Sequence, residues 1–439
     1  MVHARVDGLL TQFDSFFESD GSGIHMKILF VANEVPYPPD NGVRIPIYHA
    51  MRLMYRAGHH VALAVLTAEI DEVEARFISL TAKFRSGSSF VERIPRRHSL
   101  EIQLTAILGK RLLYVERYRS DSFRRRLTDC IGEFCPDVIH FDLIPMAQYQ
   151  NVTPVGVGTV ASINDSYALT LENALHAGYF KGFEYLYKKW QYRSTRQYEK
   201  TNYAKFQRVH VMSEIDKAYL LQLNGNLSVS VIPNGAEDSL FDIPPSDHQQ
   251  LDIIFVATLT GTHLKGLQRF LSLSWPIIRR HHPKIRLFVV GKIGPDARRV
   301  QEEYRAVTEV TFTGYVPHLP DVYRMCGIAI APVDQNCGLV NKVIEAMAAG
   351  LAVVGFEKTF AGIPHGKPDV HFVQTVDYES MGHDIAKLVA NQAWCQELKL
   401  AGRELARRYY SWSSRGESYH QMYAAAAAEA AQPLLTSTR

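Results

Sequence analysis

The sequence predicts an α/β protein made of two consecutive Rossmann-like, doubly wound domains. A chain of 439 residues is too long for one compact core, so two domains are expected. Short apolar runs typical of buried parallel strands alternate with segments of helix length. This alternation begins again at Leu251, just after a proline-containing stretch at residues 244–247 that is a plausible linker.

The composition argues against several classes of protein. The net charge of +3 gives no overall basicity that would point to nucleic acid. The five cysteines form no CxxC pair and no zinc-type cluster with histidine, which is typical of a reducing cytoplasm without structural disulfides or a metal site. No apolar run reaches the roughly 18 residues of a membrane span, and the sequence does not begin with a secretory signal.

The first domain is expected at residues 26–243, after a polar, glycine-broken extension at 1–25. It opens with a strand, a loop, a helix and a second strand, at 27–32, 33–43, 45–57 and 60–65. Prolines keep the loop from being helical, and Asn41-Gly42 permits a tight turn with positive φ. No GxGxxG fingerprint follows the first strand, so a nicotinamide site is not expected. Further strands are expected at 90–94, 136–142, 158–163, 208–212 and 228–232.

Polar residues stand at the ends of two of these strands. The strand at 136–142 ends in His140 and Asp142, which lie two residues apart and therefore point to the same side. Asn164 and Asp165 follow the next strand. Ligands of open α/β sheets bind beyond the carboxyl ends of the strands, so all four residues are site candidates.

Two segments of the first domain are strongly basic. Residues 93–126 contain ten Lys or Arg and three acidic residues, a net charge of +7, with apolar residues between them. This pattern is typical of a basic amphipathic helix on an anionic membrane surface, and also of an ordinary solvated helix face. Residues 180–208 contain eight basic and two acidic residues, a net charge of +6, with many aromatic residues. We predict a long helix there, with its aromatic side chains packed in the core rather than stacked on nucleic acid.

The second domain, expected at 250–410, repeats the alternation of strands and helices. Strands are expected at 252–258, 285–291, 310–316, 327–332, 352–354 and 371–373. The loop at 259–266 leads to a helix near 267–273. A helical segment at about 396–431 closes the chain. Its last part, at 411–439, is expected to be a C-terminal helix that packs back on the first domain, and a tail.

Residues 338–350 predict a short helix whose exposed start suits an anion. Asn341 is a good N-cap, and Gly350 can end the helix in the left-handed conformation. One face is apolar, and Asn341, Lys342 and Glu345 share the other side; the apolar residues are Val340, Val343, Ile344 and Met347. Free backbone N–H groups and Lys342 suit the phosphates of a nucleoside diphosphate, and the Glu345 carboxylate suits ribose hydroxyls. The alternative is an ordinary surface helix with one Lys/Glu pair.

Several of these landmarks occur together in one known family. They are Ala57-Gly-His-His-Val61 after the proline-rich loop, Val231-Ile-Pro-Asn-Gly235, Lys265-Gly266, and Gly338 to Val354. In this order they resemble the group 1 (family 4) retaining glycosyltransferases of the GT-B fold, over about residues 26–430. The sequence is most similar to bacterial sugar transferases of exopolysaccharide systems.

The resemblance implies two domains that face each other across a cleft. It also implies transfer of a sugar from a nucleotide-diphosphate sugar to a hydroxyl of a glycan, lipid-linked or small-molecule acceptor, with retention of configuration. The implied catalytic residues are Lys265, Asp142 and His140. The implied donor-binding residues are Gly338, Leu339, Val340, Asn341, Lys342, Glu345, Thr258, Asn41 and Gly42, and the acceptor-side candidates are Asn164 and Asp165. No Asp-x-Asp motif is present, so no metal or cofactor is expected besides the co-substrate. The expected location is the cytoplasm, including peripheral contact with an anionic membrane, and no nucleic-acid partner is expected.

The sequence departs from the family pattern at three positions. Cys337 stands where the family often has a first glutamate, and Thr258 stands near the place of a frequent arginine. The pair His140-Phe-Asp142 replaces a His-x-His motif. These departures keep two alternatives open: a sugar-nucleotide epimerase of similar architecture, and a non-catalytic protein that binds nucleotide-sugars or a partner.

Overall fold

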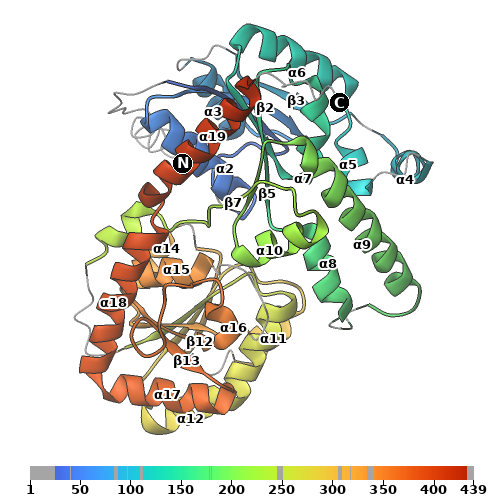
Figure 1. The fold of residues 1–439 in the computed structure, drawn as a ribbon. Helices are drawn as coiled ribbons and strands as arrows, with labels where there is room; N and C mark the ends of the chain where they lie inside the picture. Colours follow the sequence, from blue (N-terminus) through green and yellow to red (C-terminus); the bar gives the residue numbers. More distant parts are fainter. Residues whose placement is uncertain are drawn as a thin grey trace. The chain divides into compact units, whose positions relative to one another are not determined.

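The computed structural model confirms the predicted α/β class (Figure 1). It describes residues 25–39, 41–83, 88–95, 97–108, 112–176, 178, 180–244, 251–304, 309–316, 318–333 and 341–432. The chain forms two compact units. Unit 1 contains the residues up to Ile232 together with those from Gly416 onward, and unit 2 contains Pro233–Arg415.

Unit 1 is built on a seven-stranded parallel sheet with the order β3-β2-β1-β4-β5-β6-β7. Its central strands are buried along almost their whole length, as expected for a sheet covered on both faces. The strands are β1 (Lys27–Ala32), β2 (His60–Thr67), β3 (Phe90–Arg93), β4 (Val138–Asp142), β5 (Gly158–Asn164), β6 (Arg208–Val211) and β7 (Val229–Val231).

Helices from two distant parts of the sequence flank this sheet. The first group is α2 (Arg44–Arg56), α3 (Glu72–Lys83), α4 (Ser99–Leu108), α5 (Leu113–Arg117), α6 (Asp121–Phe134), α7 (Leu143–Met146), α8 (Tyr167–His176), α9 (Gly182–Asn202) and α10 (Glu214–Leu223), with the 3₁₀ turns η1 (Ala147–Val152) and η2 (Tyr203–Lys205). The second is α19 (Gly416–Ala431), which packs on β5 and α2 and lies at the red end of the colour scale in Figure 1. The Tyr423 hydroxyl of α19 lies 2.9 Å from Nδ1 of His140 on β4.

Unit 2 is built on a six-stranded parallel sheet with the order β10-β9-β8-β11-β12-β13. The strands are β8 (Ile253–Val256), β9 (Leu287–Val290), β10 (Val310–Gly314), β11 (Ile328–Ala331), β12 (Ala352–Phe356) and β13 (Val373–Thr375). The helices are α11 (Gly261–Arg269), α12 (Trp275–His281), α13 (Ala297–Glu303), α14 (Leu319–Arg324), α15 (Asn341–Ala348), α16 (Glu357–Phe360), α17 (Tyr378–Ala390) and α18 (Gln392–Tyr410), with η3 (Asp238–Asp242), the π-helical turn η4 (Phe270–Ser274) and η5 (Ser413–Arg415).

The division between the units falls at residues 232 and 233, ahead of the stretch at 244–247 that the sequence indicates as a linker. The segment after Ile232 joins unit 2 because its backbone pairs there. Ala236 forms a bridge with Ser411, and its N–H donates to the Tyr410 carbonyl at 2.6 Å.

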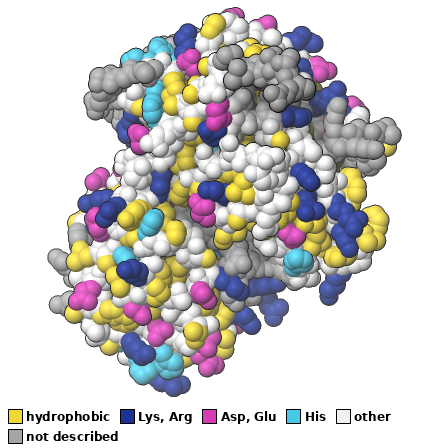
Figure 2. Space-filling model, viewed as in Figure 1, with side chains coloured by type: hydrophobic (Ala, Val, Ile, Leu, Met, Phe, Trp, Pro, Cys, Tyr) yellow, Lys and Arg dark blue, Asp and Glu magenta, His cyan; other side chains and the backbone are white. Residues whose placement is uncertain are grey.

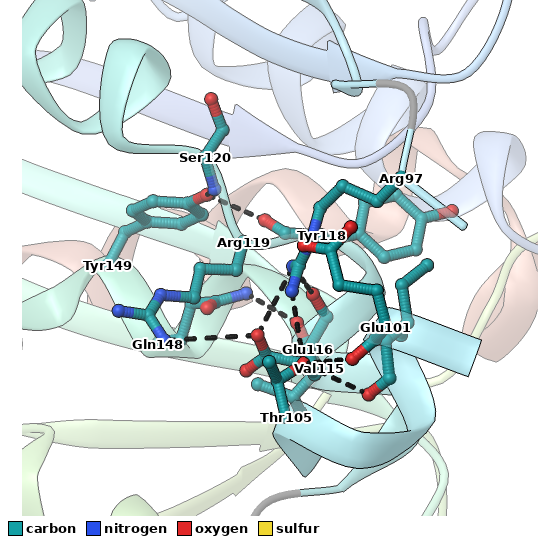
Figure 3. Close-up of polar contacts among 11 residues, drawn as sticks. Arg97, Glu101, Thr105, Val115, Glu116, Tyr118, Arg119, Ser120, Gln148 and Tyr149 are labelled. Carbon is teal, nitrogen blue, oxygen red and sulfur yellow. Dashed lines mark hydrogen bonds and ion pairs between the residues drawn. The ribbon is translucent and has the colours of Figure 1, made fainter. Parts of the chain in front are cut away.

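The basic segment at 93–126 is not one amphipathic helix. It contains α4 and α5 and the start of α6, and a buried carboxylate holds the first two together. The Arg97 guanidinium lies 3.0 Å from Glu101 on α4 and 3.2 Å from the buried Glu116 on α5 (Figure 3). Helix α6 turns an ordinary apolar face to the core, including Phe123 and Leu127.

The long helix expected at 180–208 is present as α9, but the prediction that its aromatic residues pack in the core is wrong for most of them. Phe183, Tyr185, Tyr187 and Trp190 are exposed. The reason is positional: the first two turns of α9 bury no side chain, and its buried residues, Thr195 and Glu199, lie in its second half.

Three smaller expectations are also corrected. The helix expected near 267–273 begins earlier, at Gly261, because a left-handed Gly261 turns the chain directly into a helix that buries Leu264 and Leu267. Gly42 does not have a positive φ. Instead the Asn41 side chain accepts from the backbone N–H groups of Val43 and Arg44, both at 2.9 Å, and so forms the turn. The final helical segment is broken between α18 and α19.

Among the described residues, no helix combines the length and the apolar character needed to cross a membrane.

Candidate functional site

Helix α15 ends where the sequence predicts, but Asn341, which was predicted as its N-cap, lies one position inside the helix, and its Oδ1 accepts from Asn234. Its first residue is Asn341, and Gly350 follows its last turn with φ +80°. The Gly350 N–H donates to Met347 at 2.9 Å and the Leu351 N–H donates to Ala346 at 3.0 Å, the two bonds of a Schellman motif. The apolar face is buried, since Val343, Ile344 and Met347 are almost inaccessible to solvent. The opposite side of the helix start is thereby left for polar contacts.

The polar side of α15 carries an ion pair. Lys342 Nζ lies 2.6 Å and 2.8 Å from the two carboxylate oxygens of Glu345. The hydroxyl of the buried Tyr323 donates to Glu345 at 3.4 Å. Lys342 is the more exposed partner, so its ammonium group can turn toward an anion while Tyr323 retains the carboxylate.

A cavity of about 430 Å³ lies in unit 2 at the carboxyl ends of β8 and β11 and at the start of α15. This is the edge at which open α/β sheets bind ligands. Its wall is mostly apolar, with a few polar side chains, as is usual for small-molecule pockets. The polar residues are Thr258, His263, Tyr323, Asn341, Lys342 and Thr359.

Helix α11 forms one wall of this cavity because a glycine lets it approach the sheet. A Cβ atom at Gly266 would lie 2.2 Å from the carbonyl oxygen of Pro332, so only glycine fits there. His263, one turn earlier, lines the cavity. Lys265 is exposed on the same helix and is not among the lining residues. The Lys265-Gly266 pair thus combines a packing requirement with a charge near the ligand-binding edge.

The donor-binding residues predicted in unit 2, together with the predicted catalytic residue Lys265, divide into three groups. Thr258, Asn341 and Lys342 line the cavity. Glu345 and Lys265 lie on the helices that form it, without lining it. Gly338, Leu339 and Val340, together with Cys337, lie outside the described residues.

Three of the residues at this site were not predicted from the sequence. His263 and Tyr323 line the cavity, and Asn234 donates from Nδ2 to Oδ1 of Asn341 at 3.2 Å. Asn234 belongs to the Pro233-Asn-Gly235 turn, whose resemblance to a family motif was the available signal. His263 precedes the noted lysine by two residues, and Tyr323 gave no local signal.

In unit 1 the structure brings three predicted residues together at the carboxyl edge of β4 and β5. Asp142, His140 and Asn164 are all buried, and Asp142 Oδ1 lies 3.8 Å from His140 Nε2. Among the described residues, neither oxygen of Asp142 has a hydrogen-bond partner, and the same holds for His140 Nε2 and Asn164 Oδ1. Buried polar groups are normally paired, so this edge is prepared for a polar ligand or water.

The electrostatics of the edge favour neutral groups. Burial, together with the charge of Glu34, raises the pKa of Asp142 well above its usual range. Burial lowers the pKa of His140 to about 3. Burial therefore favours the protonated form of Asp142, which can donate one hydrogen bond, beside a His140 imidazole that is uncharged at neutral pH.

The backbone at the same edge is unusual. Leu143, directly after Asp142, has φ +62°, and Asn164 has φ +63°. A left-handed leucine costs about 1 kcal/mol or more, and such residues cluster at functional sites. Asp165, which follows Asn164, is exposed as a residue, but burial of its carboxyl group, together with the charge of Asp216, raises its pKa to about 6.

The remaining predicted residues, Asn41 and Gly42, are exposed at the start of α2. A Cβ atom at Gly42 would meet no other atom within 4 Å in this structure. Just beyond them, Arg44 is held between Glu34 at 3.1 Å and Glu74 at 2.7 Å. The turn therefore begins a helix whose first residue is fixed by two carboxylates.

No group of three or more histidine, cysteine or acidic side chains suited to holding a metal ion occurs within the part of the chain that the structure describes.

The architecture is shared with solved glycosyltransferase structures. The first is sucrose-phosphate synthase from Thermosynechococcus elongatus, at 16% identity and a TM-score of 0.64, covering 91% of this chain and 98% of that one. The second is HepE from Anabaena in complex with UDP and glucose, at 13% identity and a TM-score of 0.61, covering 91% and 100%. The third is a glycosyltransferase from Rickettsia africae, at 13% identity and a TM-score of 0.62, covering 92% and 99%. The likeness shows that the fold is that of the GT-B glycosyltransferases.

The sequence of unit 2 is more specific. Residues 250–391 match the family of glycosyl transferases group 1. This match places unit 2 among the group 1 glycosyl transferases. No curated protein matches the chain by sequence.

Proposed function

We propose that this protein transfers a sugar from a nucleotide-diphosphate sugar to an acceptor hydroxyl, with retention of configuration. The observation that carries the proposal is the cavity of unit 2, where the start of α15 meets the ends of β8 and β11 inside a group 1 glycosyl transferase domain. A helix start, a lysine and an apolar chamber suit the phosphates and the base of a nucleotide.

Positive groups would stabilise the leaving diphosphate. As the bond to the sugar breaks, negative charge grows on the phosphate, and fixed donors at that position lower the barrier. In this proposal the N–H groups at the start of α15, Lys342 and Lys265 supply that charge without a metal ion. Glu345, released from Lys342, would accept from the ribose hydroxyls.

The first nucleotide to test is a uridine diphosphate. HepE is described in complex with UDP and with UDP-glucose, and TarM from S. aureus is described in complex with UDP. These titles concern proteins of low sequence identity, so they only set the order of testing.

Unit 1 would supply the polar groups for the transferred sugar or the acceptor. Asp142, in the protonated form that burial favours, would donate to one hydroxyl, and the Asn164 amide oxygen would accept from another. His140 would contribute through Nε2, while its Nδ1 remains with Tyr423. Asp165 and the Asn41-Gly42 turn would extend this edge.

Calorimetric titration with UDP and GDP tests the nucleotide site. Lys342→Ala and Glu345→Ala should each weaken the preferred nucleotide by at least about tenfold, because each removes a charge-assisted contact of about 1.5–3 kcal/mol. Lys387→Ala, an exposed lysine on α17 of the same unit, is the matched control and should change nothing. Unchanged affinity in both site variants would refute the site assignment.

Turnover tests the chemistry separately from binding. Lys265→Ala should lower the rate of transfer more than the affinity for nucleotide, and near wild-type turnover would refute its catalytic role. Product analysis separates the alternatives. An epimerase releases a changed sugar nucleotide without any acceptor, and a non-catalytic binder shows neither donor hydrolysis nor transfer.

A further inference from the structure

The first half of α9 carries an apolar stripe that nothing in the described structure covers. The stripe consists of Phe183, Leu186, Tyr187 and Trp190, which are 84%, 62%, 38% and 42% exposed. Their spacing of i, i+3, i+4 and i+7 places all four within about 100° of the helix circumference. Figure 2 shows yellow and dark blue side chains gathered at the right-hand edge of the view, where Figure 1 places α9. This spacing normally marks the buried face of a helix.

Basic residues border the stripe, and no acidic residue lies on it. Lys189 and Arg193 follow it along one edge, and Lys181 precedes the helix. Glu184, the only acidic residue in the first half of α9, lies beside the other edge of the stripe, about 60° around the helix from Tyr187. Lys188 lies 5.5 Å from the centre of the Phe180 ring, so its aliphatic stem covers aromatic surface while its charge stays free.

The second half of α9 fixes the helix to unit 1. Buried Glu199 accepts from the Ser166 hydroxyl at 2.7 Å and from the Ala168 N–H at 3.2 Å, at the start of α8. The Tyr192 hydroxyl donates to Glu172 on α8 at 2.6 Å. The stripe is therefore presented by an anchored helix, and its exposure is a property of the fold.

A second exposed apolar pair lies on α4. Leu100 and Leu104, 72% and 60% exposed, share one face of that helix. Arg97 holds α4 to Glu116 on α5, so this pair is also anchored (Figure 3). Both α4 and α9 reach the right-hand edge of unit 1 in the view of Figure 1.

We propose that the α9 stripe docks unit 1 on an anionic lipid bilayer, with Leu100 and Leu104 as a secondary contact. Tryptophan and tyrosine beside lysine are the residues that anchor helices at the level of lipid headgroups. The basic border and the net charge of +6 over residues 180–208 complement anionic headgroups. A second copy that brought the two Lys189 and Arg193 edges together would place lysine and arginine against lysine and arginine.

The proposal is independent of the nucleotide site. Its main contact is α9, outside the segment at 93–126 for which the sequence suggests a membrane contact, and from that segment it uses only Leu100 and Leu104 on α4. The basic residues of the earlier segment are partly engaged within unit 1. Arg124, for example, donates to Asn151 at 2.6 Å.

Co-sedimentation of the full chain with vesicles tests the proposal. We expect binding to vesicles of phosphatidylcholine with phosphatidylglycerol, much weaker binding to phosphatidylcholine alone, and release at high salt. The fluorescence of Trp190 should shift to the blue on binding. No binding to the mixed vesicles, or equal binding to both kinds, would overturn the proposal.

Variants distinguish binding through the stripe from non-specific hydrophobic binding to vesicles. The double variant Phe183→Ser, Trp190→Ser should weaken vesicle binding by at least about tenfold, with an unchanged circular dichroism spectrum. Lys189→Glu with Arg193→Glu should weaken binding to the mixed vesicles only. Val155→Ser and Val376→Ser remove other exposed apolar side chains and should leave binding unchanged. If light scattering instead shows a dimer that Phe183→Ser abolishes, a second copy covers the stripe and the proposal fails.

Discussion

Helices α15 and α9 carry the same apolar pattern and use it in opposite ways. In α15 the residues at this spacing, such as Ile344 and Met347, are buried against α18 and β12. In α9 the residues at the same spacing, such as Phe183 and Leu186, face solvent. Both helices place charged residues beside the stripe. The pattern therefore defines an apolar face, and only the elements that pack on it decide whether that face is core or surface.

The difference follows from where each helix lies along the chain. Helix α15 is enclosed by a strand and a helix that follow it in unit 2, and its start lies at the ligand-binding edge of the sheet. Helix α9 packs on α8 and α10, and its buried residues, Thr195 and Glu199, both lie in its second half. The buried apolar face of α15 stabilises unit 2, whereas the exposed apolar face of α9 is available to bind a partner.

The largest expected difference is in stability, when one side chain of each apolar stripe is shortened to alanine. Met347→Ala should lower the free energy of unfolding of unit 2 by about 2–5 kcal/mol, because it empties a fully buried position. Leu186→Ala should change stability by about 0.5 kcal/mol or less, because the side chain already lies in water. Urea unfolding followed by circular dichroism measures both. Comparable losses in the two variants would mean that the α9 stripe is covered in solution.

Acidification should distinguish the units that carry the two helices. All the histidines that are buried among the described residues belong to unit 1, and burial lowers the pKa of His210 to about 4. Between pH 6.5 and about pH 4, His210 is protonated in the unfolded chain but remains neutral in the folded chain. His210 should therefore destabilise unit 1 by about 1.4 kcal/mol per pH unit over that range, and no further below it.

His210→Gln tests this assignment. The variant should lose the part of the pH dependence of the free energy of unfolding that His210 contributes. Urea unfolding at pH 7 and pH 5.5 measures this difference, and hydrogen exchange in peptides from β4 and β6 assigns it to unit 1. His383→Gln, on the surface of α17 in unit 2, is the control. An identical pH dependence in wild type and His210→Gln would contradict the assignment.

The smallest expected effect concerns how each helix begins. Lys181 makes no side-chain cap on α9, whereas the first residue of α15 is bonded to Asn234. Asn234→Ala should lower the stability of unit 2 by about 1 kcal/mol and weaken nucleotide binding about fivefold. Thermal unfolding with and without UDP measures both, and the exposed Asn226→Ala serves as control. Unchanged binding would separate Asn234 from the site.

Much of the fold is predictable from local patterns. Buried parallel strands can be recognised in the sequence as unbroken apolar runs. Gly350 ends α15 in the left-handed conformation, as its position in the sequence indicates. Thr258, Asn341 and Lys342 could be found because strand ends and helix starts meet at one edge of such a sheet.

Other features depend on contacts between distant residues and carry no local signal. Arg97 meets Glu116 across 19 positions and fixes α4 against α5. Tyr323 reaches the cavity only because of how α14 packs. The exposure of Phe183 could not be read from its neighbours, because an aromatic, basic helix has the same composition whether a neighbouring element covers it or not.

The path of the chain has a consequence for synthesis. Helix α19 follows all of unit 2 in the sequence but belongs to unit 1, where Tyr423 meets His140 and Glu429 meets Arg208 at 2.5 Å. On the ribosome, domains usually complete in order from the N-terminus. Here unit 2 is continuous and can close first, while unit 1 waits until α19 has been translated. The faces of β4 and β5 that α19 covers therefore stay open to chaperones until α19 has left the ribosome.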